Sequence, residues 1–344
     1  MLGIGVIGYG YWGPNIVRNL AETPGACVRH VVDLREEQIA KVRKRYPGIQ
    51  TGANPGALLD DPGIDAIVIA SPTSTHFELA MRALQAGKHV LIEKPMVTTV
   101  REAERLVAEA ARRSLTLMVD HTYVYTPAVQ RIRELIVGGE LGNVLYYDAT
   151  RINLGLFQHD VDVIWDLAVH DVSILAYLLD AAPIAVSATG QNHLSNIPQN
   201  VAYLTMFFAG KLIAHVNVNW LSPVKIRRTI IGGSRKMLVY DDLEPSDKIK
   251  VYESGLRLEE DPEQVRRMLI GHRTGDMWAP ALPPTEALSA VAAHFVDCAS
   301  NGRPCITSGE KGLAVVRTLA AASRSVQLQG HAIDVATLEP CNPS

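Results

Sequence analysis

Residues 2–13 read LGIGVIGYGYWG, an apolar run that ends in three glycines spaced as G-x-G-x-x-G. A helical pattern follows at once, with Pro14 in its first turn, where a missing amide costs little. The next β-branched run, Val28–Val32, ends at Asp33, twenty residues after Gly13. Strand, glycine turn, helix, strand and acidic residue together form the fingerprint of a dinucleotide-binding βαβ unit, which is far more specific than the glycine spacing alone.

Each residue of this fingerprint has an expected role in binding a dinucleotide. Gly8 permits the tight turn, Gly10 lets the backbone approach a pyrophosphate, and Gly13 lets the helix pack close to the strand. Asp33 can bind a ribose 2′-hydroxyl and repel a 2′-phosphate, which favours NAD over NADP, although the nearby Arg35 weakens that preference. We expect NAD as the cofactor, with a flavin as the alternative. The residues expected to contact it here are Gly8, Gly10, Tyr11, Trp12, Gly13, Asp33 and Leu34.

The chain changes character near residue 121. Before it, strands such as Ala66–Ala70 alternate with helices, which predicts an α/β Rossmann domain with a doubly wound parallel sheet. After it, five strand-like runs follow one another from Ile184 to Tyr240, which predicts an α+β domain with a large open, mostly antiparallel sheet. We expect an NAD-binding domain over residues 1–121 and a substrate-binding and oligomerisation domain over 122–344. The last helix is a candidate to pack back on the first domain.

Composition excludes several classes of protein. With 344 residues, 47% of them hydrophobic, the chain can bury about two cores. Its formal charge of −3 and the absence of a basic stripe argue against a nucleic-acid partner. No run of 18 apolar residues predicts a membrane span, and the first residues do not resemble a signal peptide. The four cysteines show no zinc-like spacing, so we expect free thiols, a cytoplasmic location and no metal.

Two segments carry candidate catalytic groups. Glu93-Lys94-Pro95 follows the strand His89–Ile92, and ligands of open parallel sheets bind at such carboxyl ends. Lys94 is therefore a candidate for proton transfer beside a nicotinamide, and a cis peptide before Pro95 would fix it. An ordinary surface lysine is the competing interpretation.

The second segment, DLAVHD, lies in a predicted amphipathic helix over Asp162–Leu179. Asp166 and His170 are four residues apart and share a helix face, so a carboxylate can orient a histidine that acts as a base. A surface ion pair is the alternative, and a zinc site lacks further ligands. A third segment, SPTSTH, follows strand Ala66–Ala70. Its Ser71, Pro72, Thr73 and His76, together with Glu93 and Lys94, complete the expected cofactor contacts.

Taken in order, GYGYWG, SPTSTH, AGKHVLIEKP, HTYVYTPAV and DLAVHD resemble the glucose–fructose oxidoreductase/inositol dehydrogenase (Gfo/Idh/MocA) family over essentially the whole chain. The resemblance implies a Rossmann domain, a second domain whose open sheet makes oligomer contacts, and NAD-dependent oxidation of a sugar hydroxyl. It implies Lys94 as the catalytic lysine and His170 as the base, with Asp166 as its companion. Many members have glycine where this chain has Ala168, a departure that removes no catalytic group.

Within the family the chain is most similar to the branch that oxidises carbon 3 of UDP-N-acetylglucosamine or its uronic acid. That likeness implies a sugar-nucleotide substrate and a homodimer or homotetramer formed through the second sheet. The substrate contacts expected are Lys94, Tyr125, Arg151, Asn153, Asp166, His170 and Arg227, or Arg228 in place of Arg227. The alternatives are a dehydrogenase of a free polyol such as myo-inositol, a reductase of a 3-keto sugar nucleotide, and an NAD-binding regulator without catalysis.

Overall fold

The computed structural model describes residues 1–155, 161–194, 198–253 and 275–337. The chain divides into two compact units. The first contains Met1–Thr126 and Thr285–Arg317, and the second contains Pro127–Pro284 and Thr318–Leu338. Among the described residues, no helix has the length and apolar character that crossing a bilayer requires.

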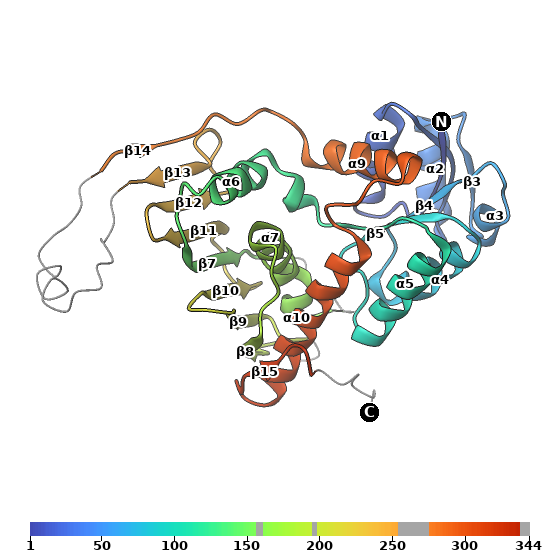
Figure 1. The fold of residues 1–344 in the computed structure, drawn as a ribbon. Coiled ribbons are helices and arrows are strands. Elements are labelled where there is room, and N and C mark those ends of the chain that lie inside the picture. Colours follow the sequence, from blue (N-terminus) through green and yellow to red (C-terminus); the bar gives the residue numbers. More distant parts are fainter. Residues whose placement is uncertain (156–160, 195–197, 254–274, 338–344) are drawn as a thin grey trace, which may run out of the picture. The chain divides into compact units, whose positions relative to one another are not determined.

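A six-stranded parallel sheet forms the centre of the first unit (Figure 1). Its order is β3-β2-β1-β4-β5-β6, the order of a dinucleotide-binding fold, so the expected Rossmann architecture is confirmed. The order in which successive strands are added to the sheet reverses between β1 and β4, and ligands of such sheets bind at the carboxyl ends of the strands beside this point. The strands are β1 (Leu2–Ile7), β2 (Ala26–Val32), β3 (Gln50–Gly52), β4 (Ala66–Ile69), β5 (His89–Glu93) and β6 (Leu117–Asp120).

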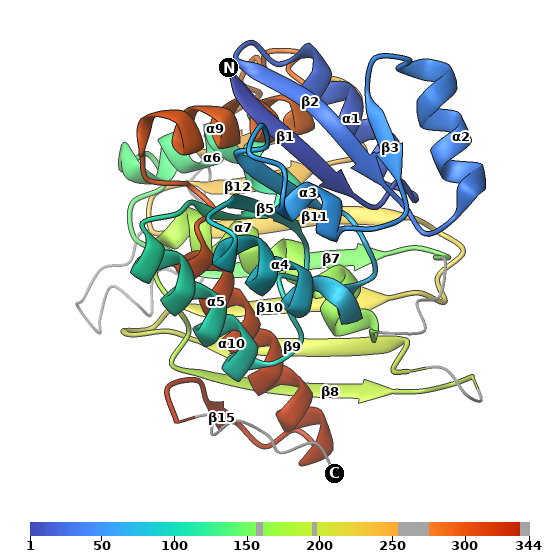
Figure 2. The same ribbon diagram turned by 90° about the vertical axis from the view of Figure 1, so that its right-hand side faces the viewer.

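Helices connect these strands, and their apolar residues recur at helical spacing. In α5, the hydroxyl of Thr99 accepts a hydrogen bond from the amide of Glu102 at 3.2 Å, as expected of a helix start, and α4 and α5 lie side by side (Figure 2). The segments are α1 (Gly13–Glu22), α2 (Glu36–Arg45), α3 (Gly56–Leu59), η1 (Thr73–Thr75), α4 (His76–Gln85), α5 (Val100–Arg113) and η2 (Thr122–Tyr125).

A late helix, α9 (Ala287–Asn301), also belongs to the first unit, whereas we expected one division of the chain near residue 121. It contacts α1 and β1, and Glu286 before it pairs with Arg18 on α1 at 2.6 Å. Its apolar residues, among them Phe295, are buried. The first unit is therefore made of two separate stretches of chain.

The second unit has a nine-stranded sheet with the order β14-β13-β12-β11-β7-β10-β9-β8-β15. Only β7 and β10 pair in parallel among these described strands, so the predicted, mostly antiparallel sheet is confirmed. The strands are β7 (Val144–Ile152), β8 (Ala185–Gln191), β9 (Val201–Phe207), β10 (Ile213–Asn219), β11 (Ile226–Gly233), β12 (Met237–Asp241), β13 (Ile249–Tyr252), β14 (Met277–Trp278) and β15 (Ile333–Asp334).

The helices of the second unit include α6 (Pro127–Val137) and α7 (Val169–Leu179), which contact each other (Figure 1). The single helix expected over Asp162–Leu179 is wrong in one respect. Its start, Ile164–Ala168, is a π-turn, labelled η3, in which the amide of Val169 bonds the carbonyl of Ile164. Such turns insert an extra residue and are frequent at functional sites. A last helix, α10 (Gly309–Gln327), begins among residues of the first unit and ends among those of the second.

Candidate functional site

The glycine turn after β1 has the backbone that its sequence predicts. Gly8 has φ +99°, and a Cβ there would lie 2.5 Å from the carbonyl oxygen of Ala70. A Cβ on Gly13 would lie 2.6 Å from the carbonyl oxygen of Gly8. Only glycine fits at either position, because a Cβ would come too close to a backbone oxygen. At Gly8 the positive φ is a second reason, since residues with a side chain rarely adopt it. Helix α1 then starts at Gly13 with Pro14 in its first turn.

Asp33, at the end of β2, is buried and forms hydrogen bonds with two neighbours. Its Oδ2 accepts from the amide of Tyr9 at 2.8 Å, and its Oδ1 accepts from the amide of Arg35 at 2.9 Å and from Arg35 Nε at 3.1 Å. Burial alone would raise the pKa of Asp33, but these hydrogen bonds outweigh it and lower the pKa below its usual value. The lowered pKa favours the ionised carboxylate, which can accept a hydrogen bond from a ribose hydroxyl. The guanidinium of Arg35 is hydrogen-bonded to the same carboxylate.

Large apolar side chains stand exposed around this turn. Tyr11 is 80% exposed, Leu34 is 86% exposed and Trp12 is 43% exposed, with the rings of Tyr11 and Trp12 edge to face. Exposed apolar groups beside a glycine turn and a helix start are what a dinucleotide would cover. The residues present therefore fit NAD, with the glycine turn for its phosphates and Asp33 for a ribose.

The loop after β4 is joined to the loop after β5 by His76. Its Nδ1 lies 3.0 Å from the carbonyl oxygen of Pro95, and its Nε2 lies 2.9 Å from that of Ser71. The ring is almost fully buried. His76 thus holds the segment that carries Lys94, and its contact with the cofactor stays a prediction. The peptide between Lys94 and Pro95 is cis, as predicted.

Lys94 lies beside a buried pair of carboxyl groups. Glu93 and Asp120 occupy paired positions on β5 and β6, and both are buried. The amide of Lys94 donates to Glu93 Oε2 at 3.1 Å, and the hydroxyl of Thr122 donates to Asp120 at 2.7 Å. Burial raises the pKa of both carboxyl groups, that of Asp120 to about 6 and that of Glu93 well above its usual value, where the charge of Asp120 adds to the shift. Burial and the nearness of the two carboxyl groups thus both act against full ionisation of the pair beside Lys94.

His121 adds a neutral imidazole at the same edge of the sheet. It is buried, and within the described ranges neither ring nitrogen has a hydrogen-bond partner. Burial, followed by the charge of Lys94, lowers the pKa of His121 to about 3. Sequence reasoning missed both Asp120 and His121, although Asp120 is the last residue of β6 and His121 follows it, at the same edge of the sheet that singled out Lys94.

The second unit holds the Asp166–His170 pair. Asp166 lies in the π-turn and accepts a hydrogen bond from Trp220 Nε1 at 3.1 Å, and His170 lies in the first turn of α7. Both side chains are half-buried. The equivalence of residues four apart on an α-helix does not hold across a π-turn. Trp220, after β10, thus fixes the carboxylate, a role that the sequence gave no reason to expect.

Arg151 lies directly behind this segment. It is buried on β7, where Nε and Nη2 bond the two carboxylate oxygens of Asp171 at 2.6 and 3.2 Å. A substrate anion is the expected partner of Arg151, and in the structure its guanidinium binds Asp171, the neighbour of His170. This pair also positions α7.

The other expected substrate residues lie in different surroundings. In the first unit, Tyr125 is buried and its hydroxyl lies 3.0 Å from that of Thr307. In the second unit, Arg227 pairs with Asp242 at 3.2 Å, and the amide of Asn153 donates to the carbonyl of Asn219. Asn153 and Arg227 are partly exposed, so both remain accessible to a ligand.

Family models match both parts of the chain. The model of an oxidoreductase family with an NAD-binding Rossmann fold (Gfo/Idh/MocA) matches residues 2–121, and the model of the GFO/IDH/MocA C-terminal domain matches residues 129–239.

Individual relatives agree. The chain is 30% identical to scyllo-inositol 2-dehydrogenase (NAD⁺) of Bacillus subtilis over 247 residues, 67% of this chain and 70% of that protein. It is 35% identical to UDP-N-acetylglucosamine 3-dehydrogenase of Acidithiobacillus ferrooxidans over 194 residues, 54% of this chain and 57% of that one. The solved structure of the latter enzyme aligns with a TM-score of 0.80 and 27% identity over 95% of this chain and 98% of its own.

Proposed function

Since this chain belongs to the Gfo/Idh/MocA family of oxidoreductases, we propose that it oxidises a hydroxyl group on carbon 3 of a UDP-sugar, such as UDP-N-acetylglucosamine or its uronic acid. The chain is an NAD-dependent dehydrogenase, and its relatives include dehydrogenases that act on sugar or polyol hydroxyls. The observation that supports the UDP-sugar is the likeness to UDP-N-acetylglucosamine 3-dehydrogenase, which extends along almost the whole fold.

Each unit contributes its own groups to the proposed reaction. Bound NAD supplies the hydride acceptor. His170 takes the proton of the substrate hydroxyl, because imidazole titrates near neutral pH and can act as a base. Asp166, fixed by Trp220, orients the imidazole or a neighbouring hydroxyl. Lys94 stabilises the developing negative charge on the substrate oxygen.

The buried carboxyl pair explains how Lys94 is supported. Negative charge on the Glu93–Asp120 pair would offset the charge of Lys94, and the raised pKa values of both carboxyl groups disfavour two carboxylates side by side in a buried site. His121 stays neutral, so it adds no second positive charge. Remote contacts with the nucleotide would add binding energy that holds carbon 3 in place. Asn153 and Arg227 are the substrate contacts proposed for the second unit.

A free polyol is the competing substrate. It is favoured by the likeness to scyllo-inositol 2-dehydrogenase, at 30% identity over two thirds of the chain. The same catalytic groups would serve it, because both kinds of substrate present a secondary ring hydroxyl to be oxidised. The reverse reaction, reduction of a 3-keto sugar nucleotide, needs the same residues with the proton moving the other way.

We propose a homodimer or homotetramer that buries the open face of the second unit's sheet. Phe207 on β9 and Ile213 on β10 are paired across the two strands and are 40% and 43% exposed. Tyr203 on β9 and Tyr146 on β7, the other neighbour of β10, are also exposed. Contiguous exposed apolar side chains on a sheet mark an interaction surface.

A single-turnover assay tests the substrate. Purified protein is mixed with NAD and, in turn, UDP-N-acetylglucosamine, its uronic acid and myo-inositol, with and without 2-oxoglutarate to reoxidise NADH, and products are weighed by mass spectrometry. A product two hydrogens lighter from a UDP-sugar supports the proposal. Oxidation of myo-inositol alone replaces it with the polyol reaction. Tight NAD binding without oxidation of any of them rejects it in favour of the reductase or of a regulator.

A further inference from the structure

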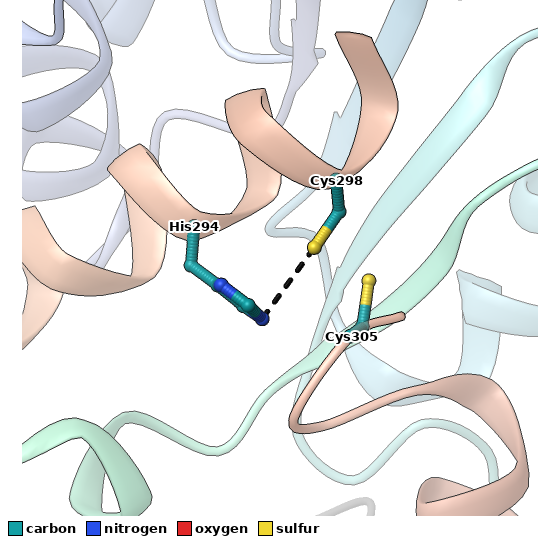
Figure 3. Close-up of side chains that lie close together, drawn as sticks. All are labelled: His294, Cys298 and Cys305. Carbon is teal, nitrogen blue, oxygen red and sulfur yellow. Dashed lines mark hydrogen bonds between the residues drawn. The ribbon is translucent and has the colours of Figure 1, made fainter. Parts of the chain in front are cut away.

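Three potential metal ligands lie together in the first unit. They are His294 and Cys298 on α9 and Cys305 on the segment that follows it (Figure 3). One ligand atom from each residue lies within 4.8 Å of the other two. We propose that these three residues bind one zinc ion through two thiolates and an imidazole nitrogen.

The local backbone explains why these three residues meet. His294 and Cys298 are four residues apart on an α-helix, so both project from the same face. The helix ends at Gly302, which has φ +64°, and the chain then turns back. Two hydrogen bonds between Thr307 and Val119 attach the returning segment to β6. The amide of Val119 donates to the carbonyl of Thr307 at 2.8 Å, and the hydroxyl of Thr307 donates to the carbonyl of Val119 at 2.7 Å. The site is therefore built on a helix and an anchored loop.

The spacing of the cluster suits zinc. Tetrahedral zinc binds sulfur at about 2.3 Å and nitrogen at about 2.0 Å, so neighbouring ligand atoms lie roughly 3.5 Å apart. Cys298 Sγ already lies 3.4 Å from His294 Nε2. Only a small inward shift of Cys305 is needed to close the set. Two cysteines and one histidine leave a fourth position for water.

The present hydrogen bonds place a nitrogen lone pair of His294 in the cluster. The amide of Ile306 donates to His294 Nε2 at 3.0 Å, so Nε2 is an acceptor, which is the form of histidine that binds a metal. Zinc would replace that hydrogen bond with a coordinate bond. The Ile306 amide is thus the hydrogen-bond donor that zinc binding would release.

The thiols must lose protons to bind the ion. A cysteine thiol is mostly protonated at neutral pH and binds zinc as the thiolate. Binding of one Zn²⁺ at this cluster therefore releases protons from the two sulfurs to the buffer, and no electrons are transferred.

The sequence alone predicted no metal, because the pattern H-x3-C-x6-C lacks the paired spacing of common zinc sites. Cys27 lies outside the cluster, and Cys341 lies outside the described residues. Cys27 is half-buried like Cys305 and so provides a matched control for substitution.

The test uses reduced, chelator-treated, full-length protein without a histidine tag. Cobalt(II) is added first, because a thiolate ligand gives an intense near-ultraviolet charge-transfer band that carboxylate or imidazole ligands do not give. We expect this band on the unsubstituted protein and its loss when one equivalent of Zn²⁺ is added. Absence of the band would overturn the proposal without reference to any variant.

Substitutions then locate the site. Cys305→Ser should weaken zinc binding at least 100-fold and abolish the rise in melting temperature that zinc causes, whereas Cys27→Ser should change neither. Two protons should be released per zinc bound. Equal zinc binding by Cys305→Ser and Cys27→Ser would overturn the proposal. So would reduced protein that takes up no zinc and whose Cys298 and Cys305 instead form a disulfide in air. None of these measurements depends on dehydrogenase activity.

Discussion

Arg151 on β7 and Asp171 on α7 form a buried ion pair, with both side chains 4% exposed or less. Two hydrogen bonds join them, and the pair ties the helix of His170 to the middle of the second sheet. Removing one partner leaves a buried charge, so Arg151→Met should lower the free energy of unfolding by about 3–5 kcal/mol. Urea denaturation followed by circular dichroism measures this. Arg303→Met, which removes an exposed pair with Asp297, should cost less than about 1 kcal/mol, and equal losses would contradict the assignment.

Arg35 lies on the carboxylate that is proposed to bind the adenosine ribose. Arg35→Ala should free Asp33 for the 2′-hydroxyl and remove the cation that would attract a 2′-phosphate. We expect the ratio of kcat/KM for NAD to that for NADP to rise about tenfold, and Asp33→Ala should lower it. Arg43→Ala on α2, whose partner is Glu36, is the control. An unchanged ratio in Arg35→Ala would reject this role.

Lys94 should be needed for turnover and not for cofactor binding. Lys94→Ala should lower kcat about 10²–10⁴-fold, the usual contribution of a positioned proton-transfer group, with an unchanged Kd for NAD. Quenching of Trp12 fluorescence gives the Kd, because this side chain is exposed at the glycine turn. Lys211→Ala, on an exposed turn, should change neither quantity. Near-normal turnover in Lys94→Ala would remove Lys94 from the mechanism.

Asp120 should make stability depend on pH in an unusual direction. The native carboxyl keeps its proton up to about pH 6, whereas the unfolded one releases it near 3.8. Between these values the native state binds more protons, so the free energy of unfolding falls as pH rises. Asp120→Asn removes this fall, and its stability relative to the unsubstituted protein should improve by roughly 2 kcal/mol from pH 4 to pH 7.

The difference between the two proteins is the quantity to measure, because His121 acts in the opposite sense. Its native pKa of about 3 lies below the usual 6.5, so its contribution to stability is lost as pH falls through that window. That contribution cancels when Asp120→Asn is compared with the unsubstituted protein by thermal unfolding at several pH values. A difference that is constant with pH would show that Asp120 has an ordinary pKa.

The open sheet face should control assembly. Phe207→Asp with Ile213→Asp places two charges at paired positions on β9 and β10, where a partner subunit would have to bury them. Light scattering after size-exclusion chromatography should then give the monomer mass. Val137→Asp, at an exposed position on α6, should leave the oligomer intact. An unchanged mass in the double variant would locate the interface elsewhere.

The first sheet was predictable because its signals are local. Glycine spacing, a β-branched strand and an acidic residue all lie within residues 2–33, and the order of strands in such a unit follows a general rule. Lys94 could be found in the same way, from its place at the end of a strand. The capping residue of α5 was equally readable.

The remaining features depend on which strands and helices become neighbours. The pairing of Glu93 with Asp120 requires the register of β5 against β6, and that of Arg151 with Asp171 requires the packing of α7 on β7. Neither is visible in a linear pattern. The π-turn at Ile164–Ala168 has no sequence signature at all, since its residues would also suit an α-helix.

The first unit is interrupted: the chain leaves it after Thr126 and returns at Thr285 to add α9. A recombination with one crossover near residue 126 would therefore separate the first 126 residues from α9, the helix that completes the first unit, and replace α9 with that of another protein. Exchange of the second unit without α9 needs crossovers near residues 126 and 284 and a third inside the continuous helix α10. Such a constraint favours the inheritance of cofactor preference and substrate preference together.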